Sequence, residues 1–449
     1  MSEDLIGRHA RPVPRYTSYP TAPHFHAGID SGTYAGWLAE LPSDTPLSLY
    51  MHVPFCDRLC WFCGCHTKQV LRYDPIAAYL PALHRETDTV ADRLDGRGHV
   101  TALHLGGGSP SMLKAEDLLE LGAHVRRSFV TAADFEFSLE IDPNDMTDER
   151  YDAFAAAGVN RISVGVQDFD PRVQRAINRL QSFEVTRDVV EGMRRRGVRS
   201  VNLDVLYGLP HQTIESIERT MAQVLSLRPD RLALFGYAHV PWMKTHQRMI
   251  DEAALPGVAE RFRQSQAAAE LIHAAGYEAV GIDHFALPTD SLAIAARAGR
   301  LHRNFQGYTT DAAPALIGLG ASSIGNLPQG YVQNTTPTGE YIRSVEKDGF
   351  STARGVAFTA EDRLRGWVIE RLMCDFAVPL DELEARFGAA ADPVLQEMHS
   401  ATLRDGDGFL SLNQKVFSIT DRGRPFVRSV AAIFDTYLAA GTSRHSVAV

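Results

Sequence analysis

The sequence predicts an α/β protein, in which an incomplete parallel (β/α)6 barrel carries an N-terminal extension and a small, mainly helical C-terminal domain. Short β-rich segments recur over residues 47–238, and helix-like amphipathic segments separate most of them. This alternation is typical of parallel sheets with right-handed crossovers. Cysteines, glycines and acids follow the predicted strands, where parallel barrels carry their chemistry.

The predicted strands, in chain order, are residues 47–53, 100–105, 135–141, 161–166, 200–208 and 231–238. Segments such as AAYLPALHRETDTVADRL and ERTMAQVLSLR supply the helices between them. We expect residues 1–44 to form a segment that covers the substrate, residues 45–355 the partial barrel, and residues 356–449 the C-terminal domain. The helix-like segments EDRLRGWVIERLM, LDELEARF and FVRSVAAIFDTYL of that domain could cover the open side of the barrel or pack outside it.

Composition excludes several classes of protein. The chain has 449 residues, of which 45% are hydrophobic, but it lacks the run of about 18 apolar residues that a membrane helix needs. Its start, MSEDLIGRHARP, does not resemble a signal peptide, so we expect a cytoplasmic protein with no membrane span. A net charge of -10 argues against nucleic acid or an anionic membrane as the main partner. Residues 5–26 are basic and could meet an acidic ligand, although charge alone favours a solvated tail.

Four of the five cysteines, Cys56, Cys60, Cys63 and Cys65, directly follow the first predicted strand. Disulfide frameworks belong to small secreted chains, and structural zinc usually takes paired C-x2-C knuckles. The C-x3-C-x2-C spacing suits three corners of a [4Fe–4S] cube, which we prefer over zinc or bystander thiols. We expect Cys65 to lie near the cluster rather than on it, because a ligand so close to Cys63 would strain the loop. Cys374 is expected to be a buried apolar residue.

This spacing, with an aromatic residue before the third cysteine, resembles the signature of radical S-adenosylmethionine (SAM) enzymes. The resemblance implies that Cys56, Cys60 and Cys63 hold the cluster and that SAM chelates the fourth iron. Reduction then cleaves SAM to a 5'-deoxyadenosyl radical.

Residues near the strand ends have both structural and ligand-binding interpretations. The glycine run 106–108 is either a tight turn or a place where a ligand approaches the backbone. Glu140 could be an ordinary exposed acid or a helix-capping group, but we prefer a role as acceptor for a ligand. Asp204 suits a ribose or a sulfonium, and its alternative role is that of a buried acid that caps the next turn. Arg179 suits a SAM carboxylate, and its alternative role is a surface ion pair.

Tyr50 and His52 lie two residues apart on one face of their strand and could point into the barrel. His52 is either a satisfied core histidine or a proton-handling group. Together with Glu140, these residues are the catalytic candidates.

The resemblance extends along most of the chain. The segments PRYTSYPTA, VQDFDPRVQRAINRLQ, DVLYGLPHQT, GIDHFALPTD and LHRNFQGYTTD are similar to those of oxygen-independent coproporphyrinogen III oxidases. They span residue 14 to about residue 325, and the segment from about residue 356 resembles that family's C-terminal domain. PRYTSYP separates this family from the related haem chaperones.

The resemblance implies two SAM molecules near one cluster. The first would contact Tyr50, Gly107, Glu140 and Ile324. The second would contact Phe62, Gly108, Ser109, Gln167, Arg179, Asp204 and Ala238, with Phe235 and Gln306 lining the same space. The family usually has Thr at position 109, so Ser109 keeps the hydroxyl and loses a methyl group.

The implied reaction converts two propionates of coproporphyrinogen III to vinyl groups, which gives protoporphyrinogen IX. We expect Arg11 and Arg15 to bind substrate carboxylates, because the guanidinium fork suits them. The other expected partners are an electron donor of flavodoxin or ferredoxin type and an unknown acceptor, and the chain is expected to be a monomer. The alternatives are a tetrapyrrole-directed radical SAM methyltransferase and a non-catalytic haem chaperone.

Overall fold

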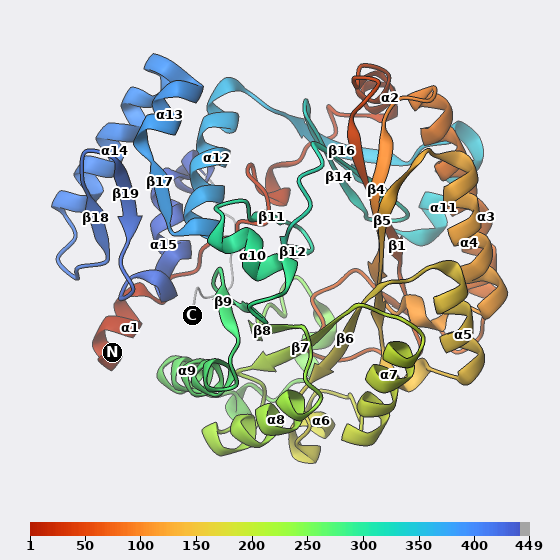
Figure 1. Ribbon diagram of the computed structural model, residues 1–449, viewed down its shortest axis with the longest axis horizontal. Coiled ribbons are helices and arrows are strands. Elements are labelled where there is room, and N and C mark those ends of the chain that lie inside the picture. Colours follow the sequence, from red (N-terminus) through yellow and green to blue (C-terminus); the bar gives the residue numbers. More distant parts are fainter. Residues whose placement is uncertain (441–449) are drawn as a thin grey trace.

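The computed structural model describes residues 1–440, in which helices cover the outside of a curved sheet and a mainly helical C-terminal region lies beside it (Figure 1). The central strands are β1 (Pro46–Val53), β4 (His99–Gly107), β5 (Thr131–Ile141), β6 (Arg161–Gln167), β7 (Ser200–Tyr207) and β8 (Arg231–Gly236). Each pairs in parallel with the next. The predicted strands and their parallel arrangement are confirmed.

Further strands, which the sequence did not predict, extend both edges of this sheet. They are β9 (Glu278–Val280), β10 (His284–Ala286), β13 (Ala315–Leu319), β14 (Ile324–Leu327), β15 (Gly330–Asn334) and β16 (Thr352–Ala357). Strand β13 is parallel to β1, and the others are antiparallel to their neighbours. Within residues 1–440 the order is β16-β15-β14-β13-β1-β4-β5-β6-β7-β8-β10-β9, so the sheet stays open.

Helices follow the central strands, as predicted. They are α3 (Asp74–Leu94), α4 (Ala115–Ser128), α5 (Asp148–Ala157), α6 (Pro171–Ala176), α7 (Phe183–Arg195), α8 (Ile214–Ser226) and α9 (Val258–Ala274). The remaining elements before the C-terminal region are α1 (Glu3–His9), α2 (Ser31–Ala39), β2 (Phe55–Cys56), β3 (Lys68–Gln69), α10 (Ser291–Arg297), β11 (His302–Asn304), β12 (Gly307–Thr309) and α11 (Thr338–Asp348). None of the helices in the described part of the chain is long and apolar enough to cross a bilayer.

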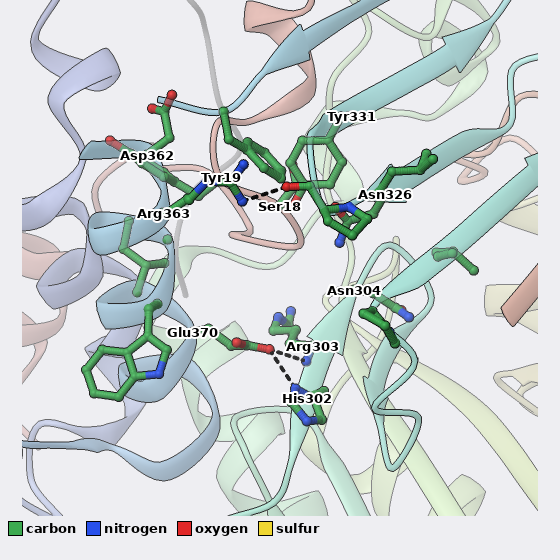
Figure 2. Close-up of a pocket in the computed structure, with 18 of the residues that line it drawn as sticks. Ser18, Tyr19, His302, Arg303, Asn304, Asn326, Tyr331, Asp362, Arg363 and Glu370 are labelled. Atoms are coloured by element: carbon green, nitrogen blue, oxygen red, sulfur yellow. Dashed lines mark hydrogen bonds and ion pairs between the residues drawn. The ribbon is translucent and has the colours of Figure 1, made fainter. Parts of the chain in front are cut away.

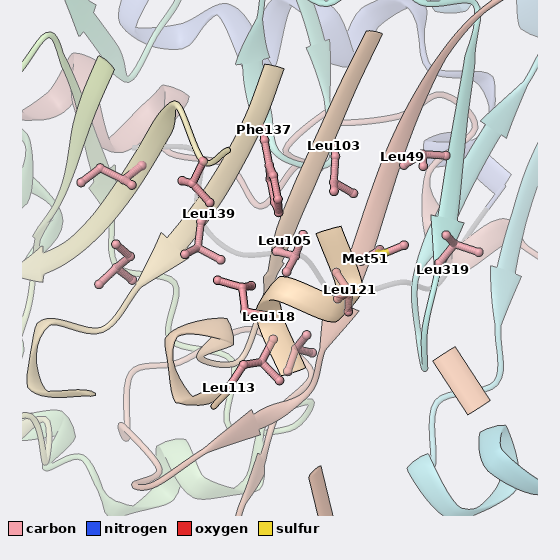
Figure 3. Packing of buried hydrophobic residues seen from close by; sticks show 14 of the residues in the cluster. Leu49, Met51, Leu103, Leu105, Leu113, Leu118, Leu121, Phe137, Leu139 and Leu319 are labelled. Atoms are coloured by element: carbon pink, nitrogen blue, oxygen red, sulfur yellow. The ribbon is translucent and has the colours of Figure 1, made fainter. Parts of the chain in front are cut away.

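Side chains alternate along each central strand, so that one face of the sheet packs in the hydrophobic core and the other faces the barrel interior. In β1, Leu49 and Met51 pack outward against neighbouring strands and the helix layer (Figure 3). Leu118 and Leu121 of α4 belong to the same buried cluster. Tyr50 lies on the opposite face of β1, because successive side chains in a strand alternate.

The C-terminal region contains α12 (Ala360–Asp375), α13 (Leu380–Phe387), α14 (Asp392–Leu403), α15 (Val427–Ala431) and α16 (Thr436–Ala440). It also contains a small antiparallel sheet of β17 (Ala377–Pro379), β19 (Val416–Ile419) and β18 (Leu410–Leu412), which was not predicted. The predicted helix over 426–438 is broken by a 3-10 turn at Ala432–Phe434. Residues 441–449 of the expected domain lie outside the described part of the chain.

The N-terminal segment joins the barrel to the C-terminal region. Tyr16 and Tyr19 are buried in the hydrophobic cluster of that region. The Tyr16 hydroxyl donates to the Asp435 carboxylate at 3.0 Å. Further along, His26 forms an antiparallel backbone bridge with Gly355 of β16.

Candidate functional site

The cysteine loop follows β1 and lies at the carboxyl ends of the central strands. Cys56, Cys60, Cys63 and Cys65 line a cavity of about 230 Å³. The same cavity is lined by other residues that the sequence placed at the site, namely Phe62, Gly107, Gly108, Ser109, Glu140, Gln167, Arg179 and Asp204. Residues from distant parts of the sequence therefore converge as expected.

The cysteine thiols occupy different environments. Burial raises the pKa of Cys56 to about 12, whereas a hydrogen bond from Cys65 lowers the pKa of Cys63 to about 7. The exposed Cys65 also donates its backbone N–H to Cys63 Sγ at 3.4 Å. Among residues 1–440, no three Cys, His, Asp or Glu side chains converge as they would on a single metal ion. An iron–sulfur cube needs no such convergence, because each thiolate binds a different corner.

A segment after β8, which the sequence analysis missed, holds the backbone of the cysteine loop. It contains the 3-10 helix Thr245–Met249. Lys244 Nζ donates to the Cys65 carbonyl at 2.9 Å, and His246 Nε2 lies 2.8 Å from the Cys63 carbonyl. The buried Gln247 donates to the Phe62 carbonyl at 3.0 Å. These contacts fix the loop without using its side chains.

Two glycines at the end of β4, Gly107 and Gly108, must be glycines for steric reasons. A Cβ on Gly107, where φ is +115°, would lie 2.5 Å from the His52 ring. A Cβ on Gly108 would lie 2.5 Å from the Phe55 carbonyl oxygen. The backbone is therefore packed against β1 and the start of the cysteine loop, and it leaves the cavity side open for a ligand.

Glu140 faces the cavity, and 40% of its side-chain surface remains accessible there. Its carboxylate accepts the Gly107 N–H at 3.0 Å and lies 3.2 Å from His104 Nε2. Burial is the largest single effect and acts to raise the pKa of Glu140, but the contacts with His104, the Gly107 N–H and His52 together lower it. An ionised carboxylate thus faces the space that a ligand would enter.

Tyr50 and His52 form a second layer behind Glu140. The Tyr50 ring stacks on His104 at 5.7 Å between centroids, and its hydroxyl lies 2.9 Å from His52 Nδ1. His52 Nε2 lies 2.9 Å from the His66 carbonyl oxygen. Burial lowers the pKa of His52 to about 4, so its ring is neutral at neutral pH. With both ring nitrogens in contact, His52 fits the interpretation of a satisfied core histidine.

Arg179 belongs to a buried ion pair rather than a surface one. Its Nη1 donates to Asp142 at 2.9 Å and lies 3.6 Å from Cys60 Sγ. Although burial acts to lower the pKa of Arg179, the charge of Asp142 raises it. Its buried Nε has no hydrogen-bond partner among the described residues. Asp142, which the sequence analysis did not assign to the site, therefore supplies part of the charge near the cysteines.

Asp204 and Ser109 already have internal partners. Asp204 accepts from Ser163 at 2.9 Å and Asn202 at 2.8 Å, and burial raises its pKa to about 6. The Ser109 hydroxyl hydrogen bonds to Asp145. These contacts orient the two side chains at the cavity wall.

Several expected residues lie outside the cysteine cavity. Arg15, Phe235 and Ala238 line a neighbouring cavity of about 420 Å³. Ile324 packs against a separate aromatic cluster, and the Gln306 N–H donates to the Asn304 side chain. Arg11 is exposed and lines a cavity between the N-terminal segment and the C-terminal region. Two of them still adjoin the cysteine loop: Gln247 Nε2 donates to the carbonyls of both Ala238 and Phe62, and Phe235 packs against the same hydrophobic cluster as Phe62.

A further cavity, of about 550 Å³, brings together residues of the PRYTSYPTA and LHRNFQGYTTD segments (Figure 2). Ser18 and Tyr19 come from PRYTSYP, and His302 and Arg303 come from LHRNFQGYTTD. Glu370 of α12 accepts the Arg303 backbone N–H at 3.4 Å and lies 3.2 Å from His302 Nδ1. No motif marked Glu370 in the sequence, because it lies within an ordinary amphipathic helix.

Comparison with known proteins gives full-length matches. Residues 50–224 match the model of the radical SAM superfamily, and residues 358–426 match the HemN C-terminal domain. The chain is 48% identical to a protein of Bradyrhizobium diazoefficiens over 97% of both chains. It is 48% identical to one of Paracoccus denitrificans over 97% of this chain and 96% of that protein. Both relatives are named oxygen-independent coproporphyrinogen III oxidase.

A solved structure gives the same result for the fold. The coproporphyrinogen III oxidase HemN of Escherichia coli, described as a radical SAM enzyme, matches with a TM-score of 0.90 and 37% identity. The match covers 95% of this chain and 100% of the solved one. The expected radical SAM type of fold, with its C-terminal helical region, is confirmed.

Proposed function

The chain belongs to the family of oxygen-independent coproporphyrinogen III oxidases in the radical SAM superfamily, and from this premise we propose its reaction. It is an oxidoreductase that converts two propionate side chains of coproporphyrinogen III to vinyl groups in haem biosynthesis. The observation that carries this proposal is the convergence of the cysteine loop and the strand-end residues in one cavity.

The family implies a [4Fe–4S] cluster and SAM, and the residues present fit both groups. Cys56, Cys60 and Cys63 would hold three irons, and Gly107 leaves the backbone open beside them. When bound, these groups supply the electron and the 5'-deoxyadenosyl radical that removes a hydrogen atom from the β-carbon of a propionate. The substrate radical would then transfer one electron to an acceptor and lose carbon dioxide, which would leave the vinyl group.

The remaining assignments follow the residues predicted from sequence. We propose two SAM molecules, the first against Tyr50, Gly107, Glu140 and Ile324. The second would contact Phe62, Gly108, Ser109, Gln167, Arg179, Asp204 and Ala238, beside Phe235 and Gln306. Ile324 and Gln306, like Phe235 and Ala238, lie outside the cysteine cavity.

The protein's own contribution is to bind and orient. The ionised Glu140 can accept hydrogen bonds from a SAM amino group or ribose. Asp204 can do the same from β7, two strands along the same sheet, and the Arg179–Asp142 pair holds Cys60 in a buried, polar setting. Tyr50 and His52 support Glu140 through His104.

We propose Arg15 rather than Arg11 as the substrate anchor of the N-terminal segment, because Arg15 lines a cavity next to the carboxyl end of β8. The electron donor would be of flavodoxin or ferredoxin type, and the protein would act as a monomer. We also keep the expected domains, with residues 1–44 covering the substrate, residues 45–355 forming the barrel and residues 356–449 following it.

An anaerobic assay tests the proposed function. Reconstituted protein with reductant, SAM and coproporphyrinogen III should release carbon dioxide and form a divinyl product, and neither should appear without SAM. A methylated product without vinyl groups would favour a methyltransferase. Tight haem binding with unchanged coproporphyrinogen III would favour a chaperone.

A further inference from the structure

A second cavity, which we call the arginine cavity, lies next to the cysteine site where three parts of the chain meet. Its described basic lining residues are Arg15 of the N-terminal segment, Arg261, His273 and Arg303 of the barrel region, and Arg424 and Arg428 of the C-terminal region. The described acids are Glu270, Asp283 and Asp421. Arg424 pairs with Asp421 at 3.1 Å, and Glu270 is exposed. The inner wall therefore carries Arg15, Arg261, Arg303 and Arg428 around Asp283.

Neutral backbone carbonyls hold these guanidinium groups in place. Arg15 Nη2 donates to the Gly236 carbonyl at 3.3 Å, and Arg261 Nη2 donates to the Tyr237 carbonyl at 2.8 Å. Arg428 Nε donates to the Pro14 carbonyl at 3.0 Å. Such bonds fix the direction of each group but do not cancel its positive charge.

The excess of positive over negative charge in the cavity is clearest at Arg303. Its side chain is 5% exposed, and its Nη1 lies 3.8 Å from Asp283, which is also 2.7 Å from His284 Nδ1. In the described part of the chain, Arg303 Nε and Nη1 lack a hydrogen-bond partner, as does Arg261 Nε. Buried charged donors without partners are costly, so an anion that enters here would gain their hydrogen bonds.

The pKa shifts of two of these arginines also favour the binding of an anion in this cavity. Burial lowers the pKa of Arg428 to about 9, and the neighbouring charges of Arg15 and Arg303 add to the effect. Desolvation in the cavity also lowers the pKa of Arg15, although part of its surface is exposed. Because arginine does not lose its proton in proteins, these shifts indicate charged groups that are desolvated and lie near like charges, and a bound anion would offset those charges.

We infer that the arginine cavity binds carboxylates of the substrate that are not reacting, while another propionate reaches the cysteine site. This inference rests on the proposed function, which supplies a substrate with four carboxylates. Phe235 and Ala238, at and just after the end of β8, line this cavity, so a macrocycle anchored here would lie beside the central strands. The planar forks of several arginines suit carboxylates.

Porphyrin binding tests the inference. The probe is coproporphyrin III, the oxidised and fluorescent form of the substrate skeleton, titrated into the reconstituted protein. We expect about tenfold weaker binding by Arg261→Gln and by Arg15→Gln, since each loses charge-assisted hydrogen bonds. Arg263→Gln is the matched control, because this exposed residue lies two positions along α9 and pairs with Glu3 and Glu260 instead. The tetramethyl ester of the probe should bind weakly to every variant.

Equal affinity of both cavity variants and the control for the free acid would overturn the inference, and so would equal affinity of the wild type for acid and ester. The ester comparison needs no variant, so it stands even if Arg261→Gln fails to fold. The decarboxylation assay keeps the two proposals apart. If the wild type forms the vinyl product but both variants bind the probe with unchanged affinity, the carboxylate-binding role of the arginine cavity is wrong and the proposed function stands. If the wild type forms no product, the proposed function is wrong.

Discussion

Glu140 illustrates how a single residue combines local structure with ligand chemistry. It lies near the end of β5, accepts the Gly107 N–H, and is kept ionised beside His104. Sequence reasoning could find Glu140, because it follows an apolar strand segment. His104 could not be found in this way, because its role depends on a cross-strand neighbour that only the sheet provides.

Replacing Glu140 with Gln should weaken SAM binding by about tenfold, because a neutral amide accepts weaker hydrogen bonds than a carboxylate. The iron content of the reconstituted protein should not change, since Glu140 is not one of the residues proposed to bind the cluster. Equilibrium binding of SAM and iron analysis measure the two effects. Glu136→Gln, on the same strand and paired with Arg161, is the control. Unchanged SAM affinity in Glu140→Gln would contradict the assigned role.

At the scale of elements, the segment after β8 acts as a support for the cysteine loop. The cysteine spacing predicts the loop, but no spacing predicts that Gln247, more than 180 positions later, holds the Phe62 carbonyl of that loop. The short strands β9, β10 and β13 to β16 were also missed. They have three to six residues, and runs such as GYVQN carry little apolar periodicity. Long central strands were predictable because burial on their outer face imposes a strong pattern.

Gln247→Ala should lower the free energy of unfolding by about 1–3 kcal/mol, because it leaves buried carbonyl oxygens and the Val240 N–H without their partner. We also expect a lower iron content after reconstitution, because the cysteine loop loses one of its three anchors. Thermal unfolding and iron analysis test this. Arg248→Ala, the exposed next residue, should leave both unchanged. Wild-type iron content in the Gln247 variant would show that the loop does not need this support.

Glu86 of α3 links several elements and predicts a dependence of stability on pH. It is fully buried, accepts from the Gly320 N–H and from Tyr341 of α11, and burial raises its pKa to about 7. The ordinary pKa is 4.5, so the folded state holds the proton more tightly than the unfolded state. The stabilisation of the folded state by protonated Glu86 is therefore fully present below about pH 4.5 and is lost as the pH rises to about 7.

The free energy of unfolding should fall by on the order of 3 kcal/mol over this pH range, since each pKa unit corresponds to about 1.4 kcal/mol. Glu86→Gln cannot titrate, so its melting temperature should vary less than that of the wild type between pH 5 and 7. Asp92→Asn, an exposed position on the same helix, should follow the wild type. Parallel curves for all three proteins would exclude Glu86 as the source.

At the scale of the whole molecule, the N-terminal segment is a structural part of both neighbouring regions. Its basic residues gave no reason to prefer an ordered segment over a solvated tail, because charge does not report the packing of Tyr16 and Tyr19. The structure places both tyrosines in the core of the C-terminal region. That docking also brings Arg15 to the arginine cavity.

The double variant Tyr16→Ala, Tyr19→Ala should release this segment, because two buried aromatic anchors cost about 3–5 kcal/mol each when truncated. We expect faster proteolytic cleavage between residues 8 and 26 and a higher KM for coproporphyrinogen III. SAM cleavage without substrate should continue. Tyr34→Ala is also buried but packs against Phe350 in the barrel core, so it should lower stability without exposing the segment. Resistance to protease in the double variant would contradict the anchoring role.

The bridge between His26 and Gly355 affects how copies of the protein behave toward one another. Strand β16 is one end of the open sheet, and a bare strand edge can recruit a strand from another copy and start aggregation. The His26 N–H donates to the Gly355 carbonyl at 2.9 Å, and the Gly355 N–H donates to the His26 carbonyl at 3.0 Å. The chain thus covers part of its own sheet edge with the segment that also reaches the arginine cavity, so we expect solubility at high concentration to depend on that segment staying in place.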